Sequence, residues 1–157
     1  MIQPSISPGA LPHLWVPFAL LLLASANLYA QQPISISLSG DAEVPPVTTS
    51  AKGTGQITVK SDRTVSGSIK VSGLVPTMAH IHEGAVGKNG PPIITLTQIG
   101  NDSFTIPARA RLTDAQYTGF TSGELYVNVH SAQYPNGEIR AQLLRTESGA
   151  TPTRASN

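Results

Sequence analysis

Apolar and polar residues alternate along most of the chain after residue 31, in short runs separated by glycine, proline, asparagine and aspartate. In ISISLSG, which starts at Ile34, every second residue is apolar, so one face of a strand is apolar and the other carries hydroxyl groups. GQITVK (55–60) and TVSGSIKVSG (64–73) repeat the pattern on either side of the polar turn SDR. These runs predict a β-hairpin, and Gly67 predicts a bulge or a close neighbour within it.

Five further runs have the same character, and with the first three they predict about eight strands: MAHIH, PIITLT, SFTI, GELYVNVH and GEIRAQLL. A chain of this length has room for one domain. We therefore expect an all-β fold, an antiparallel two-sheet sandwich or a partly closed barrel. The stretch EVPPVTTSAKG should be an extended surface loop, because Pro45 and Pro46 remove two donors that a central strand needs.

One short helix is expected among the strands. Thr113 and Gln116 have the spacing of a capping box, and Gly119 can end a helical turn. The sequence predicts a helix over residues 114–118.

The two ends of the chain differ from the rest in composition. The first charged side chain is Asp41, and the apolar run Leu14–Leu23 has the length of the central part of a secretory signal peptide. We expect a signal peptide over residues 1–30, with Ala30 or Ala26 before the cleaved bond, although no lysine or arginine precedes the run. An uncleaved membrane anchor is the alternative. The β domain would then span residues 31–146, without a membrane span after cleavage, and residues 147–157 form a polar tail expected to be disordered.

Charge and cysteine content narrow the possible chemistry. Charged residues make up 12% of the chain, the net charge is +1 and no basic run occurs, so we expect no nucleic-acid partner. The chain has no cysteine, which excludes disulfides, thiolate ligands and a cysteine nucleophile. Histidine, carboxylate and hydroxyl chemistry remain.

Three histidines form the candidate site. His80 and His82 lie two residues apart, so both project from the same face of a strand, and in GELYVNVHS the alternation leaves Tyr126, Asn128 and His130 together on a polar face. If the two strands are neighbours, three imidazoles converge in a shallow site that suits copper or zinc with one open position. Tyr126 and Asn128 would support the ligands or face a substrate. The alternative is that the histidines only form hydrogen bonds across strands.

Other residues beside these motifs have structural interpretations. Glu83 should project away from the histidines, and Ser131 beside His130 does not form a catalytic triad. Glu138 and Arg140 share one strand face, which predicts an ion pair with a neighbouring strand.

Three stretches, in order, resemble the CHRD (chordin-type) domain, a module that also occurs in exported bacterial proteins: SLSGDAEVPPVTTSAKGTG, AHIHEGAVGKNGPPIITL and SGELYVNVHSAQYPNGEIRAQL. The resemblance covers about residues 38–143. It implies an all-β domain and attaches no single chemistry to it.

HIHEGAVGKNGPP is also similar to the copper-binding H-x-H strand of copper/zinc superoxide dismutases. That similarity implies His80, His82 and His130 as copper ligands. The chain departs from the dismutase pattern because it lacks a zinc subsite, a cysteine pair and a fourth copper histidine, so water or Tyr126 would complete the shell.

We therefore expect an exported protein, periplasmic or extracellular, that binds copper or zinc through three histidines. A copper-dependent, superoxide dismutase-like redox enzyme is one alternative. A metal-free interaction module of the envelope or extracellular space, with an unknown protein partner, is the other.

Overall fold

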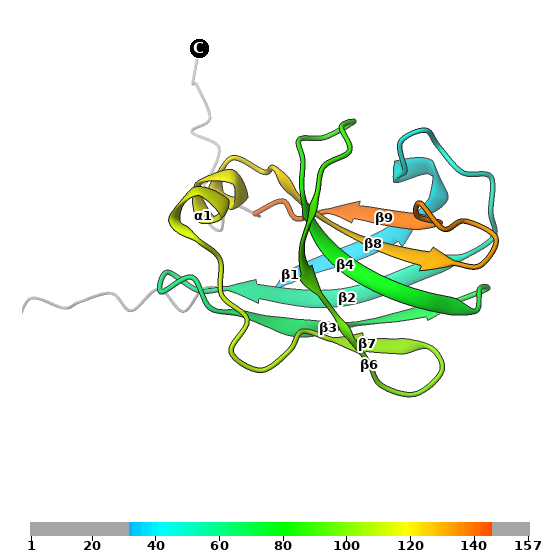
Figure 1. Ribbon diagram of the computed structural model, residues 1–157, viewed down its shortest axis with the longest axis horizontal. Coiled ribbons are helices and arrows are strands. Elements are labelled where there is room, and N and C mark those ends of the chain that lie inside the picture. The colour runs from blue at the N-terminus through cyan, green and yellow to red at the C-terminus, as the bar shows by residue number, and fades with distance from the viewer. Residues whose placement is uncertain (1–31, 146–157) are drawn as a thin grey trace, which may run out of the picture.

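The computed structural model describes residues 32–145 (Figure 1). The predicted signal peptide, residues 1–30, and the predicted tail, residues 147–157, lie outside the described residues. Within the described range, none of the helices has the length and apolar character needed to cross a membrane. Nine strands and one α-helix follow one another in the order β1 (Ile34–Ser39), a 3-10 turn η1 (Gly40–Ala42), β2 (Lys52–Val59), β3 (Val65–Ser72), β4 (Pro76–Glu83), β5 (Pro92–Thr95), β6 (Thr97–Gln98), β7 (Ser103–Thr105), α1 (Asp114–Thr121), β8 (Leu125–Ser131) and β9 (Ile139–Gln142).

All strand pairs are antiparallel, and the strands form one sheet in the order β5-β4-β8-β9-β1-β2-β3-β7-β6. Its two edge strands, β5 and β6, are separated in the chain only by Leu96, whose N–H donates to the carbonyl of Ala79. The sheet therefore curls until its edges meet at one corner. The all-β prediction is confirmed, in the form of a nearly closed barrel rather than two separate sheets.

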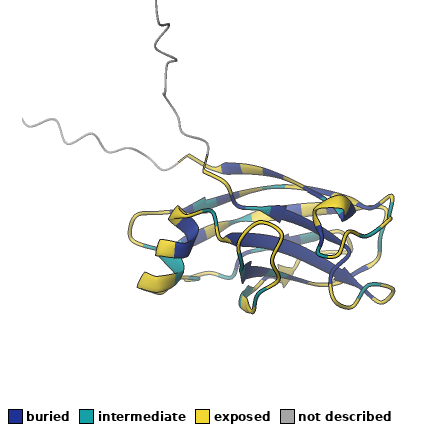
Figure 2. Ribbon diagram, turned by 90° about the horizontal axis from the view of Figure 1, so that it is seen from above, coloured by how far each residue is buried: buried dark blue, intermediate teal, exposed yellow. Residues whose placement is uncertain are grey.

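The alternating pattern places the core inside this barrel. In β1, the apolar residues predicted to face inward are buried and the intervening serines Ser35 and Ser37 are exposed. A similar alternation of buried and exposed residues continues in β2 and β3, and Figure 2 shows buried and exposed positions along the sheet. The predicted hairpin is β2 and β3, paired without a register shift. Gly67 has φ +142°, and a Cβ there would lie 2.1 Å from the carbonyl oxygen of Gln56, so this glycine serves a close backbone approach.

Helix α1 has the predicted beginning but a different end. The Thr113 side chain accepts from the Gln116 N–H, and the Gln116 side chain accepts from the Thr113 N–H, which completes the capping box. The predicted end at Thr118 is wrong, because Gly119 stays helical and the helix continues to Thr121. The glycine that ends it is Gly123, which has φ +74°.

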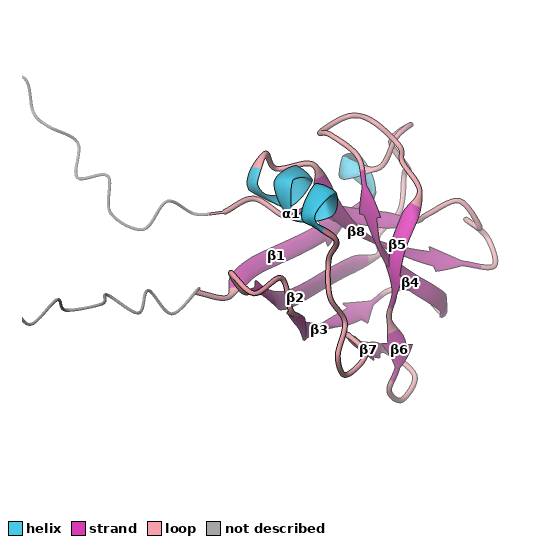
Figure 3. Ribbon diagram, turned by 60° about the vertical axis from the view of Figure 1, so that its left-hand side comes forward, coloured by secondary structure: helices cyan, strands magenta, loops and turns pink. Residues whose placement is uncertain are grey.

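Strand β8 is buried on both faces. One face lies against the barrel core. The other carries the predicted polar side chains. Loops 40–51, 84–91 and 132–138 contact this face, as their hydrogen bonds to side chains of β8 show. Figure 3 shows loops standing beside β4, β5 and β8. The segment around Pro45 is a loop as predicted, although Glu43 and Ala51 within it are buried rather than on the surface.

Candidate metal centre

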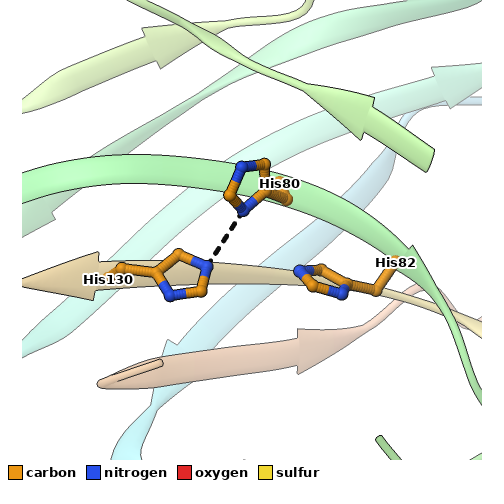
Figure 4. Close-up of side chains that lie close together, drawn as sticks. All are labelled: His80, His82 and His130. Carbon is orange, nitrogen blue, oxygen red and sulfur yellow. Dashed lines mark hydrogen bonds between the residues drawn. The ribbon is translucent and has the colours of Figure 1, made fainter. Parts of the chain in front are cut away.

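Strands β4 and β8 are neighbours, which is the arrangement that the three-histidine interpretation requires. Met78 lies opposite His130, His80 opposite Asn128, and His82 opposite Tyr126. Residues that face each other across an antiparallel pair project from the same side of the sheet. The three histidine side chains therefore meet on one face and point toward one another (Figure 4).

The ring nitrogens are spaced closely enough to share one ion. One ligand nitrogen from each histidine lies within 4.8 Å of the other two. The shortest separation is 3.0 Å, between His80 Nδ1 and His130 Nε2. Two nitrogens bound to one tetrahedral zinc ion at about 2.0 to 2.1 Å are roughly 3.3 Å apart, so small side-chain movements would accommodate a metal.

Two loop carbonyls fix the protonation of His82 and His130. His82 Nδ1 lies 2.8 Å from the carbonyl oxygen of Gly90, and His130 Nδ1 lies 2.9 Å from that of Pro135. A carbonyl only accepts hydrogen bonds, so each Nδ1 must carry the proton. Each Nε2 then presents its lone pair to the site, in the arrangement by which proteins orient metal-binding imidazoles.

His80 faces the site with its Nδ1, whereas the other two histidines face it with Nε2. Since His130 Nε2 is unprotonated, the 3.0 Å contact requires His80 Nδ1 to donate in the metal-free protein. A metal bound at this point would take the place of that proton, and His80 would carry its proton on Nε2 instead.

The site is buried, which corrects the expectation of a shallow site on a solvated face. His130 is 6% exposed and His82 8% exposed, whereas His80 is half-buried. His82 Nε2 has no hydrogen-bond partner in the structure. A buried polar atom left in this state costs about 1 to 3 kcal/mol, and a bound cation would remove that cost.

Burial also favours the neutral form of the three imidazoles. Desolvation lowers the pKa of His80, and the nearby His130 and His82 lower it further. Desolvation also lowers the pKa of His82 and of His130, and it outweighs the carbonyls of Gly90 and Pro135, which act in the opposite direction. Neutral imidazole is the form that binds metal.

Tyr126 supports the site from the side. Its ring stacks on His82 at a centroid distance of 4.8 Å, and the Arg140 guanidinium carbon lies 3.4 Å from its ring centroid. Its hydroxyl accepts from the Gly90 N–H at 3.2 Å and contacts the Gly90 carbonyl oxygen at 3.4 Å. The hydroxyl is therefore engaged by the loop that also orients His82, which does not favour the expectation that it completes a metal shell.

Arg140 forms hydrogen bonds to loop 84–91 rather than the ion pair predicted from the sequence. It is 1% exposed, and its guanidinium donates to the carbonyl oxygens of Lys88 and Ala85 and to Asn89 Oδ1. Neither ion pair of residues 32–145, Arg63–Asp114 and Lys70–Asp102, involves Arg140 or Glu138, so the predicted ion pair is wrong. Glu138 instead accepts from the Thr49 hydroxyl. Arg140 holds loop 84–91 over the site.

Glu43 is another buried polar residue near the site, and its burial was not predicted from the sequence. Its Oε1 lies 3.5 Å from Asn128 Nδ2, and desolvation raises its pKa to about 7 against the opposing effect of Arg140. The only sequence signal was a carboxylate before two prolines in a loop, which is typical of an exposed turn. Glu83, in contrast, lies toward Gly119 of α1, away from the histidines as predicted.

The protein is thus an all-β barrel with a largely buried cluster of three histidines on strands β4 and β8. The CHRD domain family model matches residues 34–143, most of the chain, and the chain belongs to this family. No curated protein and no solved structure matches it.

Proposed function

We propose that this CHRD-domain protein is exported and binds one copper or zinc ion through His80, His82 and His130. The observation that carries the proposal is the buried, unpartnered Nε2 of His82 within a set of three ligand nitrogens that lie no more than 4.8 Å apart. Histidines that only stabilise strand pairing would be expected to have both ring nitrogens hydrogen-bonded when buried.

The surrounding hydrogen bonds support the same function. The carbonyls of Gly90 and Pro135 select the tautomer that directs Nε2 inward at two of the three ligands. Neutral imidazole nitrogen is a good ligand for both copper and zinc, and intrinsic affinity favours copper.

The test is a titration of the metal-free protein with Zn²⁺ and Cu²⁺ in competition with a chromophoric chelator. We expect one ion per chain, and about tenfold or greater loss of affinity in His82→Gln, because one of the three ligands is removed. Glu83→Gln is the matched control, since Glu83 is a potential ligand next to His82 that lies on the other face. Equal weakening in both variants, or no binding by the unchanged protein, would contradict the proposal.

A second candidate function is redox catalysis at a bound copper. The half-buried state of His80, against the deeper burial of the other two histidines, favours access of a small molecule from that side. The copper-loaded protein would then accelerate superoxide decay, and His130→Ala would abolish the acceleration. Decay at the rate of buffer would leave metal binding alone.

Export is proposed from the apolar run Leu14–Leu23 and the small residue Ala30 that follows it. The intact mass of the protein recovered from the periplasm or medium tests it. We expect a chain that begins at Gln31, and a chain that retains the run would indicate an anchor. An exported protein that takes up no metal would be better explained as an interaction module.

A further inference from the structure

Asn128 lies on the same face of the β4–β8 pair as the three histidines. It is directly opposite His80 in the pairing of β4 and β8, two residues before His130 on its own strand, and diagonal to His82. Directly opposite Cβ atoms in such a pair are about 4.5 to 5.5 Å apart, and diagonal neighbours remain within reach. Asn128 is 2% exposed, so its amide has no access to bulk water.

The amide of Asn128 is oriented by two acceptors on the far side of the site. Its Nδ2 lies 3.5 Å from Glu43 Oε1 and 3.5 Å from the backbone carbonyl oxygen of Asn136. Gly137 allows this approach, because a Cβ there would lie 2.4 Å from Asn128 Nδ2. With Nδ2 directed to these acceptors, Oδ1 is the atom of the amide that remains available to the neighbouring histidines.

Two buried side-chain atoms of residues 32–145 have no hydrogen-bond partner, and they are Asn128 Oδ1 and His82 Nε2. Both atoms are lone-pair donors, because Nδ1 of His82 already carries the proton for Gly90. Neither can satisfy the other, but one cation between them satisfies both.

We infer that Asn128 Oδ1 is the fourth ligand of the metal, an inference that rests on the function proposed above. Three imidazole nitrogens and one amide oxygen form a set without sulfur, which suits the divalent ions Zn²⁺ and Cu²⁺ better than Cu⁺. Two other side chains could compete for this position. The Tyr126 hydroxyl is occupied by Gly90, and the Met78 thioether, opposite His130, belongs to a side chain that is 46% exposed.

The test compares Zn²⁺ and Cu²⁺ affinities of the unchanged protein, Asn128→Leu, Asn128→Asp and Met78→Leu, with chelator competition as the readout. Asn128→Leu keeps the size and removes the oxygen, so we expect affinity to fall about tenfold or more. Asn128→Asp retains an oxygen donor, and we expect it to bind at least as tightly as the unchanged protein. Met78→Leu, the matched control, should change affinity less than about twofold.

A measurement on the unchanged protein removes the dependence on folding of the variants. The ¹³Cγ resonance of Asn128 should shift when Zn²⁺ is added in a one-to-one ratio, because its oxygen binds the ion directly. Zn²⁺ binding that requires His82 but leaves this resonance and the Asn128→Leu affinity unchanged would overturn the inference and leave the three-histidine site intact. A loss of affinity in Met78→Leu alone would assign the fourth position to the thioether instead. Absence of any binding by the unchanged protein would overturn both proposals.

Discussion

Replacement of Glu43 by glutamine should change the pH dependence of stability in a defined way. Glu43 is 6% exposed, and burial raises the pKa of its carboxyl from 4.5 to about 7. Since the folded pKa is the higher one, the folded protein holds this proton more tightly than the unfolded chain. Stability is therefore lost as pH rises from about 4.5 through 7. Glutamine has a similar shape, accepts from Asn128 Nδ2 in the same way, and does not titrate.

The size of the effect follows from the pKa difference. A rise from 4.5 to about 7 corresponds to about 3 kcal/mol at 1.36 kcal/mol for each pH unit. Glu43 lines an open hollow of 390 Å³ together with Asp41, Arg140 and Gln142, so water partly solvates the ionised carboxylate. We therefore expect the free energy of unfolding of Glu43→Gln, relative to the unchanged protein, to increase by about 2 to 3 kcal/mol between pH 4 and pH 8.

Urea unfolding of both metal-free proteins at several pH values measures this difference in stability. The change of the difference with pH, rather than its size at one pH, reports the protonation of Glu43. The histidine contributions are present in both proteins and cancel. A direct pKa measurement from the Glu43 carboxyl ¹³C shift serves as the independent control. A stability difference that stays flat from pH 4 to pH 8 would refute the argument that burial keeps this carboxyl protonated.

Three other predictions concern the histidines, Gly137 and Arg140. In the metal-free Glu43→Gln protein, where the opposing titration of Glu43 is absent, stability should fall as pH drops below about 6.5. Each of the three histidines has a lowered folded pKa, so the unfolded chain then binds more protons. The slope is at most about 1.4 kcal/mol per pH unit for each histidine, and urea unfolding measures it. Gly137→Ala should destabilise the protein by at least about 1 kcal/mol more than Gly100→Ala. Both glycines have positive φ, but only at Gly137 would the added Cβ contact Asn128 and Glu43. Thermal unfolding compares the two variants, and equal losses of stability would show that this contact does not matter. Arg140→Lys should increase hydrogen exchange in loop 84–91, because lysine keeps the charge but cannot form the same set of bonds to that loop; unchanged exchange would contradict the role given to Arg140.

Strand periodicity alone predicts much of this fold. Alternation of apolar and polar residues indicates both which face of each strand enters the core and that His80 and His82 project together. It also places Tyr126, Asn128 and His130 on one face, and the pairing of β4 with β8 confirms that the two sets meet. Local capping chemistry predicts the start of α1, whereas its end depends on which of two nearby glycines adopts positive φ.

The burial of the site could not be predicted from the same pattern. A polar strand face is solvated by default, and period two does not reveal that loops will cover it. Here the cover depends on contacts between residues distant in sequence, such as Asn89 Nδ2 with the Val44 carbonyl and Arg140 with the Lys88 carbonyl. Such contacts decide that His82 and His130 are desolvated and that Glu43 becomes a buried acid.

We propose that a single metal ion is held between His80, His82 and His130. Anomalous diffraction from crystals of the protein loaded with Zn²⁺, recorded on both sides of the zinc absorption edge, tests it most directly. We expect one strong peak per chain, within about 2.0 to 2.1 Å of one nitrogen from each histidine, with His130 Nε2 and His82 Nε2 among them. A map with no peak in this cluster, or with zinc bound only at exposed side chains elsewhere, would contradict the claim and leave the histidines as cross-strand structural residues.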